Sequence, residues 1–451
     1  MSIYNKLNLI NKKINGLVSI FDHDHLVKDN SLTYLAKDNI NYFGYPTTAS
    51  SDILNGYISP YNATVINKLN NSNAVCFGKT SMDGLGMGGS NLTANTGPVY
   101  NPYDLSRISG GSSGGSAAFN SYNIVDFTLG TDTGDSIRKP ASYCGNIGVK
   151  PSYGRISRYG IIPYASSLDH VGYFTNSISK ACKILDIIKG RDDKDMTSLN
   201  DDNHFYYQHL KDDLKGKKIG IIKNIYDLIY IDKLKNDLDD FIKILKDKGA
   251  IVEFVSLDHQ LLQAILPTYL VIANCEASAN HSNLDGIRFG NQYSGKDLDE
   301  IMINSRTNGL TYNIRKRFLF GSYGLYQENQ ELIFNKAKRV RRLIVDEYLS
   351  KTNDYDAIIN LASLNVAPKI NDISNVDESK DEYLIGENHL VIANFCGIPS
   401  LTMPFTTIDQ LPIGININTK FKDEQMLFNI AYSFEKIIKI NDLKDKINYE
   451  L

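Results

Sequence analysis

The side chains best suited to chemistry lie in two small polar clusters and at one lysine upstream of them. The clusters are GGSSGGS at residues 110–116 and TDTGDS at residues 131–136, and the lysine is Lys37. Glycine has no Cβ, so backbone N–H groups in such segments can approach a ligand closely, while serine hydroxyls donate and accept hydrogen bonds. This composition indicates a site for an anion or a developing oxyanion. A flexible linker is the alternative, and two clusters beside α/β elements make it less favoured.

Three known motifs match these segments formally, and each lacks a feature that it needs. Residues 110–114 match G-x-S-x-G, but no convincing strand precedes them, as a nucleophile elbow requires. Ser136 and Lys139 match S-x-x-K, yet Pro140 is expected to keep Lys139 out of the helical turn of that motif. Residues 78–80 end like a phosphate-binding loop, but residue 73 is not glycine. An α/β-hydrolase, a penicillin-recognising enzyme and a P-loop NTPase are therefore disfavoured.

Taken together, the clusters resemble the signature of the amidase signature family. The similarity covers GGSSGGSAA at residues 110–118 and GTDTGDSIR at 130–138, and the K-D-N sequence at 37–39 matches an upstream family motif. That family uses a Ser-cis-Ser-Lys triad. The resemblance implies that Ser136 is the nucleophile, Ser112 the bridging serine and Lys37 the base, and the spacing excludes Lys79 from that role. It also implies an α/β fold with a large mixed central β-sheet covered by helices on both faces.

Amide cleavage places physical demands on these residues. The serine needs a base, and the oxyanion of the tetrahedral intermediate needs hydrogen-bond donors. Lysine accepts a proton only when it is neutral, and burial lowers its pKa from about 10.4. In the family, backbone N–H groups that correspond to Thr133, Gly134 and Asp135 form the oxyanion hole. The family usually has glycine at position 135, so Asp135 brings a carboxylate next to Ser136.

Within the family, the similarity is greatest to the glutamine-hydrolysing subunits of tRNA-dependent amidotransferases. It extends from residue 33 onward, through KPSYGR at 150–155 and DGIRFG at 285–290. The resemblance implies that Tyr269, Arg317 and Glu387 bind glutamine, the arginine at its carboxylate and the acid at its ammonium group. Glu387 stands where the family pattern has aspartate. Without the resemblance, Arg317 would be interpreted as part of a solvated helix face.

The resemblance also implies a function. The chain would hydrolyse glutamine and supply ammonia for the conversion of Glu-tRNA(Gln), or also Asp-tRNA(Asn), to the amidated form. A tRNA-binding B subunit with kinase and transamidase activity would use ATP and Mg²⁺, and a small C subunit would join the complex. This chain itself would need no cofactor or metal. The alternatives are a stand-alone amidase for a small carboxamide and a non-catalytic scaffold.

Two further segments carry weaker signals. Residues 22–25, DHDH, could bind a metal, but nothing downstream completes such a site, so a solvated loop is expected. Asp169 and His170 could orient a serine nucleophile. A structural role is expected for them, because Lys37 explains activation of the serine without a histidine.

The hydrophobic pattern predicts the elements that position these residues. Residues 80–116 contain too few apolar side chains for core elements, so a long functional loop is expected there. Alternation and short apolar runs predict strands at 33–36, 74–78, 124–129, 218–222, 251–255, 356–359 and 413–417. Helical spacing predicts helices at 61–72, 234–248, 261–272, 313–348 and 425–440.

Composition limits the range of functions. A chain of 451 residues with 42% hydrophobic and 22% charged residues can bury a large core. Its net charge of -3 gives no positive field for binding nucleic acid. Its five cysteines form no C-x-x-C pair of the kind used in zinc or redox sites. No apolar run approaches the length of about 20 residues that a membrane-spanning helix needs. We therefore expect a cytoplasmic protein that meets tRNA only through a partner.

The resemblance further divides the chain into two regions. Residues 1–36 are expected to be a shortened N-terminal segment that lacks part of the family's helical region. Residues 37–451 are expected to form the amidase signature domain, with a charged connector at about 189–204.

Overall fold

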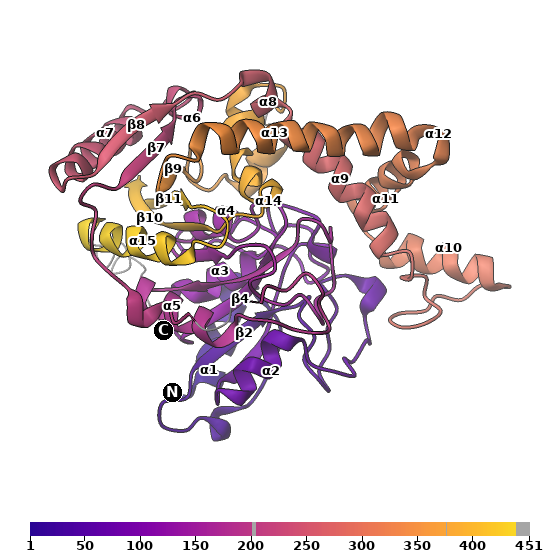
Figure 1. Ribbon diagram of the computed structural model, residues 1–451. Coiled ribbons are helices and arrows are strands. Elements are labelled where there is room, and N and C mark those ends of the chain that lie inside the picture. The colour runs from indigo at the N-terminus through magenta and orange to yellow at the C-terminus, as the bar shows by residue number, and fades with distance from the viewer. Residues whose placement is uncertain (201–203, 376, 439–451) are drawn as a thin grey trace.

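One mixed β-sheet forms the centre of the computed structural model, which describes residues 1–200, 204–375 and 377–438 (Figure 1). In spatial order its strands are β1 (Leu17–Ile20), β3 (Val75–Thr80), β2 (Thr33–Lys37), β4 (Phe127–Asp132), β6 (His170–Thr175), β5 (Ile147–Lys150), β10 (Ser400–Ile408), β11 (Leu411–Asn418), β9 (Ala357–Leu361), β7 (Lys218–Ile222) and β8 (Ile251–Val255). Strand β2 pairs in parallel with β3 and β4, and β7 pairs in parallel with β8 and β9, whereas the other neighbours are antiparallel. The predicted large mixed sheet is confirmed.

Hydrophobic side chains cover both faces of this sheet. Along β2, Tyr34 and Ala36 belong to one core cluster, and Leu35 between them belongs to another. Successive strand residues point to opposite faces, so the two clusters lie on opposite sides of the sheet. The cluster of Leu35 includes residues of α1 (Ile3–Ile14), α3 (Gly114–Ser121) and α4 (Arg138–Tyr143). The cluster of Tyr34 includes residues of α2 (Thr64–Asn71), α5 (Ile178–Ile188) and α15 (Glu424–Ile438).

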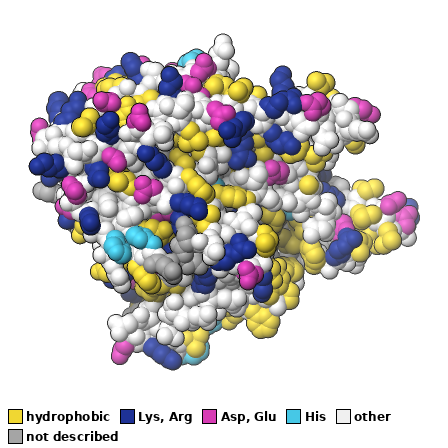
Figure 2. Space-filling view, viewed as in Figure 1, with side chains coloured by type: hydrophobic (Ala, Val, Ile, Leu, Met, Phe, Trp, Pro, Cys, Tyr) yellow, Lys and Arg dark blue, Asp and Glu magenta, His cyan; other side chains and the backbone are white. Residues whose placement is uncertain are grey.

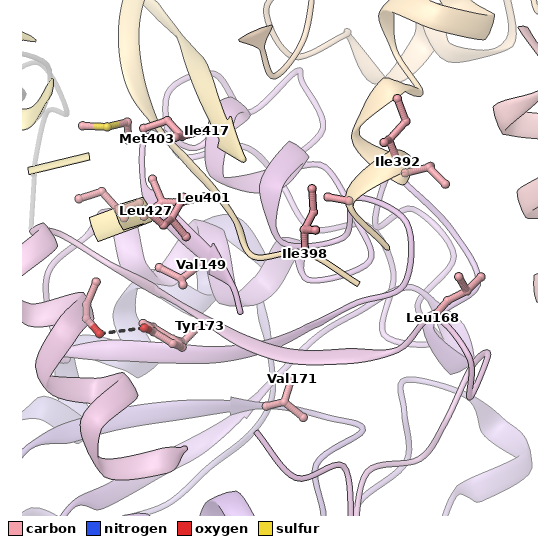
Figure 3. Packing of buried hydrophobic residues seen from close by; sticks show 14 of the residues in the cluster. Val149, Leu168, Val171, Tyr173, Ile392, Ile398, Leu401, Met403, Ile417 and Leu427 are labelled. Atoms are coloured by element: carbon pink, nitrogen blue, oxygen red, sulfur yellow. Dashed lines mark hydrogen bonds between the residues drawn. The ribbon is translucent and has the colours of Figure 1, made fainter. Parts of the chain in front are cut away.

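The larger cluster joins strands and helices that are distant in sequence (Figure 3). Val149 of β5, Leu401 of β10 and Leu427 of α15 lie close together in this view. Tyr173 of β6 packs in the same cluster, and its buried hydroxyl donates a hydrogen bond of 2.8 Å to the carbonyl oxygen of Ala181. This bond satisfies a polar group that would be costly to bury alone. The core therefore holds the middle of the sheet rigid behind the polar clusters.

Most predicted elements occur within a few residues of their expected bounds, and among the predicted strands the one expected at residues 124–129 differs most. It forms as β4, and its last three residues, Gly130 to Asp132, pair with residues 170–172 of β6. Ladder hydrogen bonds use the backbone, so these polar residues can extend the strand although they lack apolar side chains. The polar cluster at 131–136 therefore begins inside the sheet and leaves it after Asp132.

An arm of helices extends away from the sheet (Figure 1), beginning with α9 (Ile265–Asn280) and α10 (Leu298–Gly309). The prediction of a single helix at 313–348 is wrong, because α11 (Tyr312–Leu325) ends at Leu325 and the next residue, Tyr326, leaves the helical conformation with a ψ of 141°. The arm continues as α12 (Gln327–Gln330), a π-helical turn (Glu331–Asn335) and α13 (Lys336–Thr352). The arm exposes large hydrophobic side chains, among them Leu319 and Leu332. On the face drawn in Figure 2, hydrophobic side chains lie among charged groups of both signs. Outside the arm, the other α-helices of the described residues are α6 (Lys223–Asp227), α7 (Asp232–Asp247), α8 (His259–Gln263) and α14 (Ile392–Phe395).

The N-terminal segment is packed against the sheet. Helix α1 buries Leu7, Ile10 and Ile14, and the carboxylate of Asp24 accepts hydrogen bonds from the backbone N–H groups of the first turn of this helix. Residues 1–36 thus contribute α1, β1 and most of β2, and their separation from the rest remains a prediction.

Part of the predicted connector, residues 201–203, and the end of the last predicted helix, residues 439–440, lie outside the described residues. Among the described helices, none has the length and hydropathy required to cross a membrane.

Candidate active site

Lys37 stands at the end of β2, and its side chain is fully buried. Its Nζ lies 2.7 Å from Ser112 Oγ and 2.8 Å from Ser113 Oγ, and it lies 3.3 Å from the carbonyl oxygen of Thr131. The amine thus contacts both polar clusters predicted from the sequence. Ser113 was not assigned a role there, although it neighbours Ser112 in the same cluster.

The surroundings of Lys37 favour the neutral amine. Burial lowers the pKa of Lys37 from 10.5 to about 7, although the carboxylates of Asp83, Asp132 and Asp169 act in the opposite direction. Desolvation dominates because the ammonium form loses its water and, among the described residues, gains no carboxylate at contact distance. Near pH 7, a substantial fraction of this amine can therefore accept a proton.

Glycines allow the loop that carries Ser112 to reach this amine. The Gly111–Ser112 peptide bond is cis, and Gly110 adopts a positive φ of 76°. A Cβ on Gly111 would lie 2.0 Å from Asp83 Oδ2, a contact that no side chain tolerates. Asp83 is itself fixed, because its carboxylate accepts hydrogen bonds from the Asn91 backbone and from Thr93. Glycine at position 111 is therefore required by this close approach.

Ser136 lies between the end of β4 and the start of α4, and only 4% of its surface is exposed. Its carbonyl oxygen accepts a hydrogen bond of 3.2 Å from the Ser113 N–H, which joins the two clusters through the backbone. Within the described residues, Ser136 Oγ makes no hydrogen bond. The structure therefore brings Lys37 into contact with Ser112, and it joins the backbone of Ser136 to Ser113, the neighbour of Ser112.

A buried ion pair fixes the loop around Ser136. Arg138 and Asp132, both inaccessible to solvent, are joined at 2.9 Å, and Arg138 also donates a 2.6 Å hydrogen bond to the Gly134 carbonyl. Burial alone would raise the pKa of Asp132, but the Arg138 guanidinium holds it well below its usual range. Sequence reasoning gave Arg138 no role of its own, although it belongs to the GTDTGDSIR run.

The backbone of residues 133–136 presents hydrogen-bond donors. Within the described part of the chain, the N–H groups of these four residues have no protein acceptor. The Thr133 hydroxyl donates a 2.7 Å hydrogen bond to Asp169, which also accepts hydrogen bonds from the backbone N–H groups of Tyr164 and Ala165. His170 is buried, with Nδ1 2.6 Å from the Leu168 carbonyl oxygen.

Tyr269 and Arg317 come from the arm, and the ring of Tyr269 reaches the same loop. A Cβ on Gly134 would lie 3.0 Å from the Tyr269 ring, so that ring packs directly on the loop. Arg317 Nη1 donates a 2.9 Å hydrogen bond to the hydroxyl of Tyr164, a residue that the sequence did not single out. Arg317 is half-buried, whereas its neighbours at positions 315 and 316 are exposed. It therefore differs from the solvated helix face on which it lies.

Glu387 is placed near the same loop but is bound to protein groups. Its Oε2 forms an ion pair of 2.6 Å with Lys139, and its Oε1 accepts a 3.1 Å hydrogen bond from the Leu364 N–H. The sequence-based exclusion of Lys139 from a helix is wrong, because α4 begins at Arg138 and includes both Lys139 and Pro140. Proline is tolerated there because N–H groups in the first turn of a helix lack intrahelical acceptors.

A cavity of about 600 Å³ opens beside the loop of Ser136. Asp135, Lys139 and Glu387 line one part of it, together with Tyr143 and Tyr383. The cavity is large enough for a small organic substrate.

The remaining candidates lie outside this arrangement. Lys79 Nζ donates to the Ile40 carbonyl at 2.5 Å and lies 3.7 Å from Asp38, so its amine is engaged away from the serines. In the DHDH segment, Asp24 binds the start of α1, and His23 lies between the Cys76 carbonyl and the Tyr45 hydroxyl. Within the described residues, no group of three or more His, Cys, Asp or Glu side chains could hold a metal ion.

Comparison with known proteins decides the family. A family profile described as Amidase matches residues 32–428. The chain belongs to the amidase family. A relative from Thermoanaerobacter pseudethanolicus, named as the A subunit of glutamyl-tRNA(Gln) amidotransferase, is 37% identical, and the alignment covers 98% of this chain and 92% of that protein.

Solved structures of amidase family members have the same fold. The crystal structure of the A subunit of glutamyl-tRNA(Gln) amidotransferase from Thermotoga maritima is 32% identical, with a TM-score of 0.80 over 96% of this chain and 91% of that one. A bacterial aryl acylamidase of the amidase signature family gives a TM-score of 0.85 at 20% identity, covering 100% of this chain and 96% of that chain. Because its sequence identity is only 20%, the similarity to the aryl acylamidase shows the fold alone.

Proposed function

We propose that this amidase family member hydrolyses glutamine and supplies the ammonia to a tRNA-dependent amidotransferase. Its chemistry would be carried by Lys37, Ser112 and Ser136. The observation that supports this proposal most strongly is the 2.7 Å contact between Lys37 Nζ and Ser112 Oγ, at a buried amine whose pKa lies at about 7. In this scheme the base is a lysine rather than a histidine.

In the proposed reaction, neutral Lys37 accepts a proton from the Ser112 hydroxyl while Ser112 accepts the proton of Ser136. Ser136 Oγ attacks the carboxamide carbon, and the oxyanion is stabilised by the backbone N–H groups of Thr133, Gly134 and Asp135. The relay then returns a proton to the nitrogen, ammonia departs, and water hydrolyses the acyl-serine to release glutamate.

Glutamine would lie against the loop of Ser136. We propose that Arg317 binds the glutamine carboxylate and that Tyr269, whose ring packs on Gly134, forms a wall of the site. Glu387 is the acid that the family resemblance assigns to the ammonium group. In the structure, Glu387 forms an ion pair with Lys139.

Partner subunits complete the proposal. The relatives named above are A subunits of glutamyl-tRNA(Gln) amidotransferases, and the net charge of -3 makes this chain a poor binder of tRNA on its own. A tRNA-binding B subunit would therefore activate Glu-tRNA(Gln) with ATP and Mg²⁺, and a small C subunit would join the complex. Asp-tRNA(Asn) is a second proposed acceptor. The place of action would be the cytoplasm.

The first test is glutamine hydrolysis by the purified complex carrying Ser136→Ala. Glutamate production should fall by a factor of about 10³ or more, because loss of the nucleophile leaves only binding and oxyanion stabilisation. The exposed Ser294→Ala provides the matched control and should retain activity. Wild-type rates in Ser136→Ala would refute the assignment.

A second test separates ammonia supply from amidation. With Glu-tRNA(Gln), ATP and Mg²⁺, the Ser136→Ala complex should form no Gln-tRNA(Gln) from glutamine but should form it when ammonium chloride is added. The same assay with Asp-tRNA(Asn) tests the second acceptor. A chain that hydrolyses small carboxamides at full rate without any partner would instead act as a stand-alone amidase.

A further inference from the structure

Asp135 carries an acidic side chain directly beside the nucleophile. Its carboxylate makes no hydrogen bond or ion pair within the described residues, although the neighbouring Asp132 is bound by Arg138. Asp135 also lines the cavity of about 600 Å³. A half-buried carboxylate left in this state inside a cavity is unusual, because desolvation of a charge must normally be compensated.

Glu387, the acid that the family resemblance assigns to the substrate, is in the opposite situation. Lys139 Nζ lies 2.6 Å from its Oε2, the Leu364 N–H donates to its Oε1 at 3.1 Å, and Ser363 Oγ lies 3.0 Å from Oε1. Its side chain is 26% exposed. Both oxygens of Glu387 are therefore engaged, and its charge is balanced by Lys139 at contact distance.

This pairing leaves an uncompensated negative charge at position 135. Lys139 lies one helical turn after Asp135, where its N–H donates to the Asp135 carbonyl oxygen, but its ammonium group is directed to Glu387. Burial raises the pKa of Asp135 to about 6, and the positive charges of Lys139 and Arg138 counteract that rise. Around neutral pH the carboxylate is therefore charged and available for a cation that enters the cavity.

The position of Asp135 suits a substrate cleaved by Ser136. The Cα atoms of consecutive residues lie about 3.8 Å apart. In glutamine, the ammonium nitrogen is four bonds from the carboxamide carbon, which is at most about 5 Å in an extended chain. A carboxylate next to the nucleophile is thus within reach of the ammonium group of a substrate whose amide meets Ser136.

We propose that the Asp135 carboxylate, rather than Glu387, receives the ammonium group of the amide substrate and thereby selects α-amino acid amides. The ion pair between Lys139 and Glu387 then forms a fixed wall of the cavity. This inference rests on the proposed function, in which Ser136 attacks the substrate.

The test compares two substrates in the purified protein with the subunits that accompany it. Glutamine carries the ammonium group, and N-acetylglutamine lacks it but keeps the carboxamide and the carboxylate. In Asp135→Asn, the ratio of kcat/KM for glutamine to that for N-acetylglutamine should fall by about 10- to 100-fold, mainly through KM, as expected for loss of one hydrogen bond to a charged group. Asp135→Glu restores the charge and should recover part of the ratio.

The exposed Asp372 provides a matched control, because it lines the same cavity and can undergo the same substitution. Its Asp372→Asn variant should leave the ratio within about twofold of the wild type. Covalent labelling of Ser136 by an acylating probe verifies that each variant is folded.

Two results would overturn the inference. The first is an equal fall of kcat/KM for glutamine and for N-acetylglutamine in Asp135→Asn. The second is a fall in the ratio of the two kcat/KM values in Glu387→Gln while Asp135→Asn keeps the wild-type ratio. An inactive Ser136→Ala together with an unchanged ratio in Asp135→Asn would refute this inference alone. An active Ser136→Ala would instead refute the proposed function.

Discussion

Replacing Lys37 with methionine measures whether its amine is neutral in the folded protein. Burial takes the pKa of Lys37 from 10.5 to about 7, and each pH unit corresponds to about 1.4 kcal/mol. Keeping the ammonium form buried therefore destabilises the fold by about 5 kcal/mol at low pH. Methionine has a similar length and no charge, so Lys37→Met removes this penalty together with the hydrogen bonds of the amine to Ser112 and Ser113.

The sign of the pH dependence follows from proton binding. Below about pH 6, the amine is protonated in both the folded and the unfolded chain, so the stability difference between variant and wild type should be constant. Between pH 7 and 10.5, the unfolded chain holds a proton that the folded chain has lost, so the wild type gains stability relative to Lys37→Met. Between pH 7 and pH 9, the free energy of unfolding of the wild type should rise by about 2 kcal/mol relative to that of Lys37→Met.

Urea unfolding at pH 5.5, 7 and 9 measures the difference in free energy of unfolding between the wild type and Lys37→Met. Circular dichroism follows the unfolding, because the chain has no tryptophan. The loss of the hydrogen bonds of the Lys37 amine changes the difference in unfolding free energy equally at all three pH values. The control is Lys316→Met, which makes the same exchange at an exposed position. Lys37→Met should also lack glutaminase activity. A stability difference that stays constant from pH 7 to pH 9 would show that Lys37 remains charged, and the proposed base would be refuted.

Two further predictions concern the loops that hold the serines. Gly111→Ala should lower kcat by about 100-fold, because its Cβ would meet Asp83 at 2.0 Å and displace the loop, whereas Gly89→Ala meets no atom within 4 Å and should retain activity. Equal kinetics for the two variants would contradict the close approach. Arg138→Met should lower the free energy of unfolding by about 3 to 5 kcal/mol in a urea titration, since it leaves the buried Asp132 unpaired. A loss below about 1 kcal/mol would show that this ion pair does not hold the loop.

Much of the framework could be predicted from the sequence, because it depends on local pattern. Buried parallel strands appear in the sequence as short apolar runs, so the strand that ends at Lys37 and the strand at 218–222 lie within a residue of their predicted bounds. The pattern failed where backbone hydrogen bonds rather than side chains determine the element. Strand β4 continues through polar Gly130 to Asp132 because β6 supplies a partner, and α4 accepts Pro140 in its first turn.

The sequence alone determined which residues of the two polar clusters could carry chemistry, since glycines, serines and an upstream lysine keep their types and spacing in any fold. Only the tertiary structure decided how those groups are charged and paired, because pKa values and ion pairs depend on burial and on neighbours distant in the chain. Lys37 is held near a pKa of about 7 by the surrounding core, and Glu387 meets Lys139 across 248 positions of sequence. Asp135 remains open to the cavity for the same reason, because the ammonium group of Lys139 is already bound to another acid.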